Sequence, residues 1–127
     1  MSPLFRFVST PVPGSGRGKT LRVPTINLDL ASVPRELTEG IYACIVFLEN
    51  SEKRMHASMH YGPRPVFEDS VSCEVHLLDQ VLSELPAQLT IEVVERLRDV
   101  QNFDSVEALL QQISEDNARA RAILKNA

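Results

Sequence analysis

A stretch near the N-terminus, residues 14–27, combines residue types that suit a partner carrying phosphates. From Gly14 to Lys19, glycine occupies every second position with two cations among the glycines, and such a backbone can approach a ligand closely. The following Pro-Thr-Ile-Asn predicts the start of a strand, on which Thr25 and Asn27 would point to the same face. Two neutral oxygens beside a cationic loop suit a hard cation such as Mg²⁺ that arrives bound to phosphates.

The glycine-rich loop also has a simpler interpretation as a flexible turn, which is the more common structure for such a segment. It is not a Walker A loop, because the Gly-x4-Gly-Lys-Ser/Thr spacing is absent. It is not a dinucleotide-binding fingerprint either, because no strand–turn–helix unit surrounds it. The residues alone therefore leave both a phosphate site and a plain turn open.

Composition predicts one globular domain covering residues 1–127, with no nucleic-acid and no membrane partner. Apolar residues make up 43% of the chain and charged residues 24%, and the net charge of −4 argues against a general nucleic-acid binder. No segment has the length of a membrane span, and the N-terminus is too short and interrupted for a signal peptide. We therefore expect a cytoplasmic protein, and a monomer.

The two cysteines, Cys44 and Cys73, lie in apolar segments and lack the spacing of a metal site. This environment predicts small, buried thiols in a reducing compartment. A disulfide between them stays possible, although no second pair of cysteines supports it.

Alternation of apolar and polar residues predicts six strands, at 4–8, 24–30, 41–48, 54–61, 70–78 and 89–97. The third is apolar almost throughout, which indicates a central strand buried on both faces. In the fifth, Glu74 shares the polar face with Ser72 and His76, where a solvated glutamate is the usual outcome.

The chain ends with a predicted helix. Asp104 and Glu107 have the spacing of a capping box, in which Asp104 is the N-cap. One apolar stripe at helical spacing follows, made of Val106, Leu109, Leu110, Ile113, Ala120 and Ile123. Strands first and a helix last predict a mainly β fold, a closed or nearly closed antiparallel barrel of six strands with the helix packed on it.

The order of short motifs along the chain resembles the riboflavin kinase (flavokinase) family. The motifs are the glycine-rich loop, Pro-Thr-Ile-Asn at 24–27, Gly-Ile-Tyr at 40–42, Gly-Pro-Arg-Pro at 62–65, Glu-Val-His at 74–76, Leu-Arg at 97–98, Asn-Phe-Asp-Ser at 102–105 and the final helix. In bacteria this module is usually fused behind an FMN adenylyltransferase domain, and we expect a free-standing kinase module here. The resemblance implies a six-stranded Greek-key barrel with a C-terminal helix.

The same resemblance implies a reaction and the residues that carry it. The family transfers the γ-phosphate of ATP to the 5′-hydroxyl of riboflavin, giving FMN and ADP, with Mg²⁺ as cofactor. Glu74 matches the family's catalytic glutamate, a general base, and Thr25 and Asn27 match the pair that binds the metal. The implied nucleotide-binding residues are Gly14, Lys19, Thr25, Leu77 and Asp79, and the implied flavin-binding residues are Arg98 and Phe103.

Two departures from the family pattern keep other functions open. Arg22 stands where the family usually has a glycine, and Pro86-Ala87 replaces a usual Tyr-Gly. A module that binds flavin or nucleotide without catalysis, as a sensor or carrier, is therefore the alternative. A β-barrel interaction domain without a small ligand is the third possibility.

Overall fold

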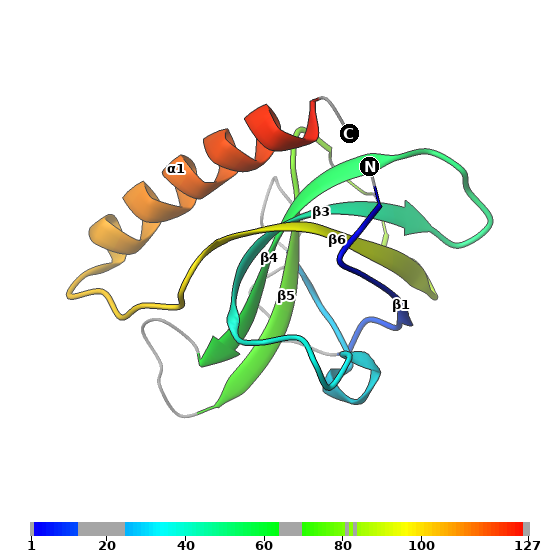
Figure 1. The fold of residues 1–127 in the computed structure, drawn as a ribbon, viewed down its shortest axis with the longest axis horizontal. Helices are drawn as coiled ribbons and strands as arrows, with labels where there is room; N and C mark the ends of the chain where they lie inside the picture. Colours follow the sequence, from blue (N-terminus) through cyan, green and yellow to red (C-terminus); the bar gives the residue numbers. More distant parts are fainter. Residues whose placement is uncertain (1, 13–24, 64–69, 81, 83, 126–127) are drawn as a thin grey trace.

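The chain folds into one curled antiparallel sheet with a helix on its outer face (Figure 1). The computed structural model describes residues 2–12, 25–63, 70–80, 82 and 84–125. The elements are β1 (Phe5–Ser9), β2 (Thr25–Asn27), the 3₁₀ turn η2 (Leu30–Ser32), β3 (Gly40–Leu48), β4 (Met55–Pro63), β5 (Val71–Leu77), β6 (Leu89–Arg98) and α1 (Val106–Leu124). The predicted loop with Gly14, Lys19 and Arg22 lies outside the described residues.

The strand order across the sheet is β1-β6-β3-β4-β5-β2, and every neighbouring pair is antiparallel. Within it, β6 returns to lie beside β3 after the consecutive strands β3, β4 and β5, which is the Greek-key arrangement. The mainly β fold with six strands and a final helix is thus confirmed. The second strand ends at Asn27, three residues earlier than predicted, because the Asp29 side chain accepts a hydrogen bond from the Ala31 N–H and turns the chain into η2.

The curl of the sheet brings its two edges together at one place. Pro11, just after β1, forms a bridge with Leu28, just after β2. Around it, the Val12 N–H donates to the Asn27 carbonyl (2.9 Å) and the Asp29 N–H to the Thr10 carbonyl (3.1 Å). The six strands therefore form a half-barrel whose edges are joined over this short stretch.

Two apolar clusters form the core, one inside the curl and one beneath α1. Strand β3 supplies both, because Tyr42 and Cys44 face the inside while Ala43 and Ile45 face the helix. The prediction of a central strand buried on both faces is confirmed. Cys44 and Cys73 are free and buried. Burial raises the pKa of the Cys44 thiol and raises that of Cys73 to about 12, so both stay protonated at neutral pH.

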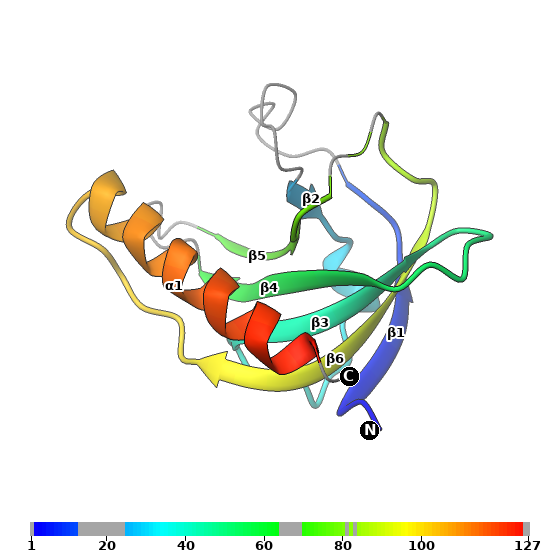
Figure 2. The ribbon, with the colours of Figure 1, turned by 90° about the horizontal axis from the view of Figure 1, so that it is seen from above.

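Helix α1 runs across the outer face of β3, β4 and β6 (Figure 2). Its N-cap is Ser105, whose hydroxyl accepts a hydrogen bond from the Ala108 N–H at 3.1 Å, so the prediction of Asp104 was wrong by one residue. The predicted apolar stripe was wrong at Val106 and Leu110, which are 60% and 59% exposed. The fully packed face instead carries Asp116, Ala120 and Leu124. Within the described residues, no helix is long and apolar enough to cross a membrane.

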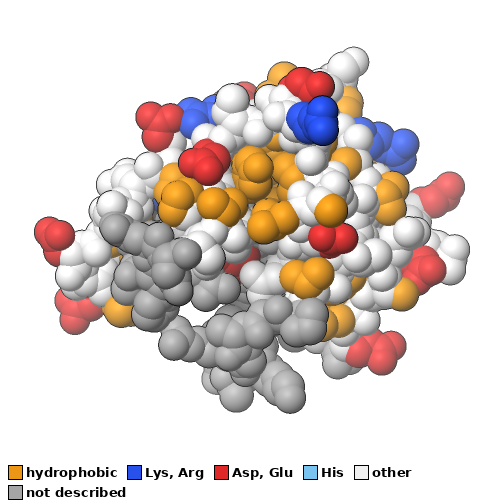
Figure 3. Space-filling model, turned by 90° about the horizontal axis from the view of Figure 1, so that it is seen from below, with side chains coloured by type: hydrophobic (Ala, Val, Ile, Leu, Met, Phe, Trp, Pro, Cys, Tyr) orange, Lys and Arg blue, Asp and Glu red, His pale blue; other side chains and the backbone are white. Residues whose placement is uncertain are grey.

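One face of the molecule gathers hydrophobic side chains near its centre, with charged residues mostly around them (Figure 3). Across the described residues, the large hydrophobic side chains that are exposed are Leu4, Val8, Leu30, Val71, Leu85, Val106 and Leu110. Exposed apolar side chains are normal on a monomer, so they assign no partner by themselves. The expected monomer stays a prediction.

Candidate active site

A cavity of about 230 Å³, here named the helix pocket, lies between the outer face of the sheet and the N-terminal half of α1. The strands contribute mostly polar side chains, including Thr25 from β2 and Glu74 from β5. The helix contributes the apolar side chains of Leu109 and Ile113. Such a mixture of an apolar wall and a few convergent polar groups is typical of a small-molecule site.

Strand alternation explains why polar groups gather on this wall. In β5, Cys73 and Val75 point into the core, so Glu74 between them points outward. In β2, Ile26 is buried inside the curl while Thr25 and Asn27 on either side of it are partly exposed, as their spacing predicted. The strand register sets Thr25 opposite His76 and Asn27 opposite Glu74. A hydroxyl, an amide and a carboxylate therefore lie on one face as close neighbours.

The carboxylate of Glu74 is oriented by a buried neighbour. The Ser72 hydroxyl, two residues earlier on the same face, donates a hydrogen bond to one Glu74 oxygen at 3.0 Å. Sequence reasoning placed Ser72 on this face but gave it no role. Its spacing of two from Glu74 on an alternating strand was the signal that could have identified it.

Two histidines of the helix pocket are held in the neutral form. Burial lowers the pKa of His60 and that of His76. The Nε2 atom of His60 lies 3.0 Å from the Pro63 carbonyl, which only accepts hydrogen bonds, so Nε2 carries the hydrogen. The His76 Nδ1 atom lies 3.4 Å from the Thr25 hydroxyl oxygen. The two histidines therefore add hydrogen-bonding groups to the pocket wall but little positive charge near neutral pH.

The two predicted flavin-binding residues lie side by side. Arg98, at the end of β6, lines the helix pocket. Its guanidinium carbon lies 5.9 Å from the centre of the Phe103 ring, within the range of a cation–π contact. The same guanidinium forms an ion pair with Asp116 of α1, with Nη2 and Oδ2 2.8 Å apart. Sequence reasoning missed Asp116, although it lies three residues after Ile113 and four before Ala120, on the stripe that faces the sheet.

The structure does not bring every predicted nucleotide residue to the helix pocket. The Leu77 side chain is fully buried inside the curl, on the opposite face of β5 from Glu74. Asp79 has a left-handed backbone (φ 59°), and its carboxylate accepts hydrogen bonds of 2.9 and 3.0 Å from Arg121 of α1. These hydrogen bonds lower the pKa of Asp79. The pocket thus brings together Thr25, Glu74 and Arg98, but not Leu77 or Asp79.

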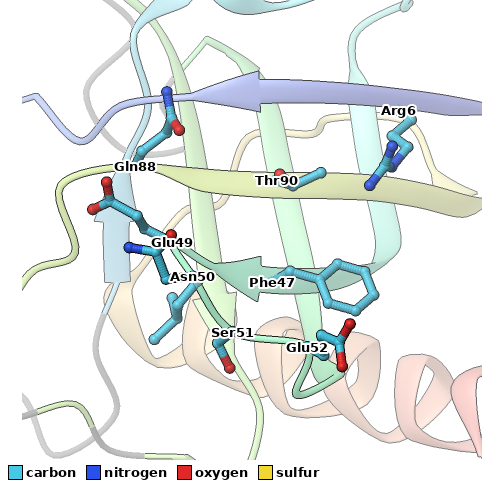
Figure 4. A pocket seen from close by; sticks show the side chains of 9 residues that line it. Arg6, Phe47, Glu49, Asn50, Ser51, Glu52, Gln88 and Thr90 are labelled. Carbon is cyan, nitrogen blue, oxygen red and sulfur yellow. The ribbon is translucent and has the colours of Figure 1, made fainter.

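A second cavity, here named the turn hollow, lies at the connection between β3 and β4 and is larger, about 580 Å³ (Figure 4). Its walls include Phe47, Glu49, Glu52 and Thr90. Arg6 also lines it and forms a partly exposed ion pair with Glu92 at 3.3 Å. Of the expected site residues that the structure describes, none lines the turn hollow.

Comparison with known proteins identifies the family. The family model described as riboflavin kinase (Flavokinase) matches residues 2–124. The bifunctional riboflavin kinase/FMN adenylyltransferase of Pseudomonas fluorescens is 31% identical over 119 residues, which are 94% of this chain and 38% of that protein. The chain spans between 18% and 38% of the length of the first curated relatives it matches.

Two solved structures share the fold. A crystal structure of riboflavin kinase from Trypanosoma brucei aligns with a TM-score of 0.57 at 19% identity, over 98% of this chain and 82% of that one. A crystal structure described as a macrolide-efflux protein from Streptococcus pneumoniae aligns with a TM-score of 0.75 at 27% identity, over 94% of this chain and 38% of that one. With the family model matching nearly the whole chain and the fold agreeing, the chain belongs to the riboflavin kinase family.

Proposed function

We propose that this chain transfers the γ-phosphate of ATP to the 5′-hydroxyl of riboflavin, giving FMN and ADP. The observation that carries the proposal is the helix pocket, where Thr25 and Glu74 on neighbouring strands face an apolar wall from α1. A phosphoryl transfer needs a positioned acceptor hydroxyl, neutralised phosphate charge and a group that takes the hydroxyl proton. Membership of the family adds the substrate pair to this arrangement.

Glu74 is the proposed general base for the 5′-hydroxyl of riboflavin. The hydrogen bond from Ser72 occupies one acceptor site of one Glu74 carboxylate oxygen and restrains the side chain. Among the described residues, none donates a hydrogen bond to the other oxygen, so its acceptor sites are available to a substrate hydroxyl. A base held within hydrogen-bond reach of the proton it removes typically contributes about 10²–10⁴-fold to a rate.

Thr25 and Asn27 are the proposed ligands for Mg²⁺. Both offer neutral oxygens, which hard cations accept, and among the described residues there is no group of three or more His, Cys, Asp or Glu that could hold a metal. This donor set fits a cation that takes its remaining ligands from water and nucleotide phosphates, as Mg²⁺ does. The bound ion would neutralise charge on the transferred phosphoryl group.

The wall of the helix pocket is the proposed flavin-binding surface. Leu109 and Ile113 of α1 and Ile41 of β3 offer apolar side chains to a flat aromatic ring. Arg98 lines the pocket and would face the polar edge of the flavin ring. Phe103, whose ring centre lies 5.9 Å from the Arg98 guanidinium carbon, would contact the flavin ring from beside the pocket.

For the nucleotide, Gly14 and Lys19 are proposed to cover the phosphates. Leu77 and Asp79 are proposed as further nucleotide contacts. Because the Leu77 side chain is buried in the core, its contact would be made through the backbone. Asp79 would have to exchange part of its pairing with Arg121 for a nucleotide group.

A product assay tests the proposed function. Purified protein is incubated with riboflavin, ATP and Mg²⁺, and riboflavin and FMN are separated by chromatography and detected by fluorescence. We expect FMN to form in proportion to the protein added. Riboflavin binding without FMN formation from ATP, CTP or GTP would instead identify a flavin-binding module without catalysis.

A further inference from the structure

Asp116 is a carboxylate that helix α1 buries against the sheet. Its side chain is 6% exposed, and the Arg98 side chain that it faces is 17% exposed. The Arg98 Nε atom donates to Oδ1 at 2.9 Å and to Oδ2 at 3.1 Å, and Nη2 donates to Oδ2 at 2.8 Å. The Gln112 side chain adds a donor to Oδ1 at 3.1 Å. Such a fork-like, charge-assisted pair fixes geometry more firmly than a single contact.

The Arg98 guanidinium is held on all of its nitrogens. While Nε and Nη2 bind Asp116, Nη1 donates to the Asp99 carbonyl at 2.8 Å. The guanidinium carbon also lies 5.9 Å from the centre of the Phe103 ring. Arg98 is therefore engaged mainly in holding protein groups, although it lines the helix pocket.

The position of Asp116 divides α1 into two differently supported halves. On its C-terminal side, Ala120 and Leu124 are fully buried in the core beneath the helix. On its N-terminal side, Leu109 and Ile113 line the helix pocket, so a cavity lies beneath this half. Asp116 itself lines the helix pocket, and the Ser58 hydroxyl donates to the Oδ1 atom of the adjacent Asn117 at 3.0 Å. These two residues thus fix the helix next to the apolar wall.

We propose that Asp116 is a positioning residue whose pair with Arg98 holds the N-terminal half of α1 over the helix pocket and thereby sets the affinity for riboflavin. The inference rests on the proposed function, because it takes the pocket to be the riboflavin site. Loss of either partner leaves the other buried without its counter-charge, so the helix half shifts and the apolar wall is displaced. Asp116 acts through the wall and does not itself contact the reacting atoms.

A double-mutant cycle on riboflavin affinity tests the proposal. The variants are Asp116→Asn, Arg98→Gln and the double variant, and riboflavin binding is measured by quenching of flavin fluorescence. We expect each single change to weaken binding by about 10-fold or more, and the double change to be no worse than the weaker-binding single variant, because the two residues act as one unit. If the affinity losses of the two single variants instead multiply in the double variant, Arg98 binds the flavin independently of Asp116, and the proposal is overturned.

Steady-state kinetics separate positioning from general damage. In the single variants we expect the KM for riboflavin to rise about 10-fold, while kcat at saturating riboflavin and the KM for ATP change by less than about 3-fold. A fall in kcat equal to the fall in kcat/KM, with riboflavin affinity unchanged, would contradict the proposal. Arg6→Gln removes an ion pair between β1 and β6, outside the helix pocket, and is the control that leaves riboflavin affinity unchanged.

A milder variant covers the case in which the buried-pair variants fail to fold. Gln112→Met removes one hydrogen bond to Asp116 while keeping a similar volume. We expect about 2- to 5-fold weaker riboflavin binding with a far-ultraviolet circular-dichroism spectrum like that of the wild type, and unchanged affinity would overturn the proposal.

The product assay on the wild type distinguishes this inference from the proposed function. If the wild type forms FMN but the affinity losses of the two single variants multiply in the double variant, only the Asp116 inference is rejected. Absence of riboflavin binding by the wild type rejects both the inference and the proposed function.

Discussion

The helix pocket and the turn hollow, both formed by described residues, differ in how their walls are built. The helix pocket is walled by side chains from β2, β3, β4, β5, β6 and α1, whose regular geometry directs side chains from distant parts of the chain into one space. The turn hollow is walled largely by residues 47–52, which are neighbours in sequence at the end of a strand and in the following turn. The hollow is the larger, at about 580 Å³ against about 230 Å³, yet the carboxylate, hydroxyl and guanidinium expected to do chemistry converge in the smaller cavity. Convergence of groups on rigid elements identifies a site better than volume does.

The largest expected difference between the two cavities concerns one carboxylate in each. Glu74→Gln removes the proposed base without changing side-chain shape, so we expect kcat for FMN formation to fall about 10²–10⁴-fold. Glu49→Gln makes the same chemical change in the turn hollow, and we expect kcat within about 2-fold of the wild type. The product assay measures both, and equal losses in the two variants would remove the distinction between the cavities.

A second matched pair concerns hydroxyls. Thr25→Val keeps the branched shape but removes the proposed metal-binding oxygen, so we expect kcat/KM to fall about 10–100-fold and half-maximal activity to need more Mg²⁺. Thr90→Val is the counterpart in the turn hollow. Titration of Mg²⁺ against the initial rate measures the effect, and an unchanged Mg²⁺ requirement in Thr25→Val would exclude Thr25 as a ligand.

Apolar residues of the two cavities are expected to differ in what they control. Ile113→Ala removes part of the proposed flavin wall, and we expect riboflavin affinity to fall about 5-fold. Phe47→Ala in the turn hollow removes a ring that packs on the core beneath α1, and we expect a loss of about 1–3 kcal/mol in unfolding free energy with riboflavin affinity unchanged. Flavin titration and urea unfolding measure the two effects. The reverse pattern would place the flavin at the hollow.

The smallest effect concerns the pH dependence of stability at the helix pocket. The pKa of His60 is lowered in the folded state, so the unfolded chain takes up a proton first as the pH falls. The contribution of His60 to the free energy of unfolding is therefore complete above the pKa of the unfolded chain, about 6.5. It is lost as the pH falls toward the lower pKa of the folded state. His60→Gln cannot titrate, and we expect it to lose less unfolding free energy than the wild type between about pH 7 and about pH 5. Urea unfolding at the two pH values measures this, and equal losses would mean that His60 does not contribute.

Local patterns in the sequence were sufficient to predict most of the strands and which of their faces are buried. Alternation in β5 assigned Ser72, Glu74 and His76 to one face, and the structure has them on the outer face of the sheet. The apolar segment of β3 indicated a strand buried on both faces, because neither set of alternate residues is polar. Each of these properties depends on residues a few positions apart, which is why sequence alone contains them.

The remaining features depend on contacts between distant residues. Asp104 and Ser105 are both good N-cap residues, so residue type alone does not choose between them. The burial of Asp116 depends on Arg98, eighteen residues earlier and on another element, and an acid on a helix is otherwise expected to be solvated. The exposure of Val106 and Leu110 likewise follows from which side of α1 faces the sheet.

Mapping of riboflavin binding by hydrogen exchange tests most directly whether the helix pocket is the flavin site. Amide exchange is followed by mass spectrometry with and without saturating riboflavin, which needs no mutation and no turnover. We expect slower exchange in residues 109–117 of α1 and 71–77 of β5, with no change in residues 47–52 of the turn hollow. Slower exchange confined to residues 47–52 would contradict the assignment of the flavin site to the helix pocket.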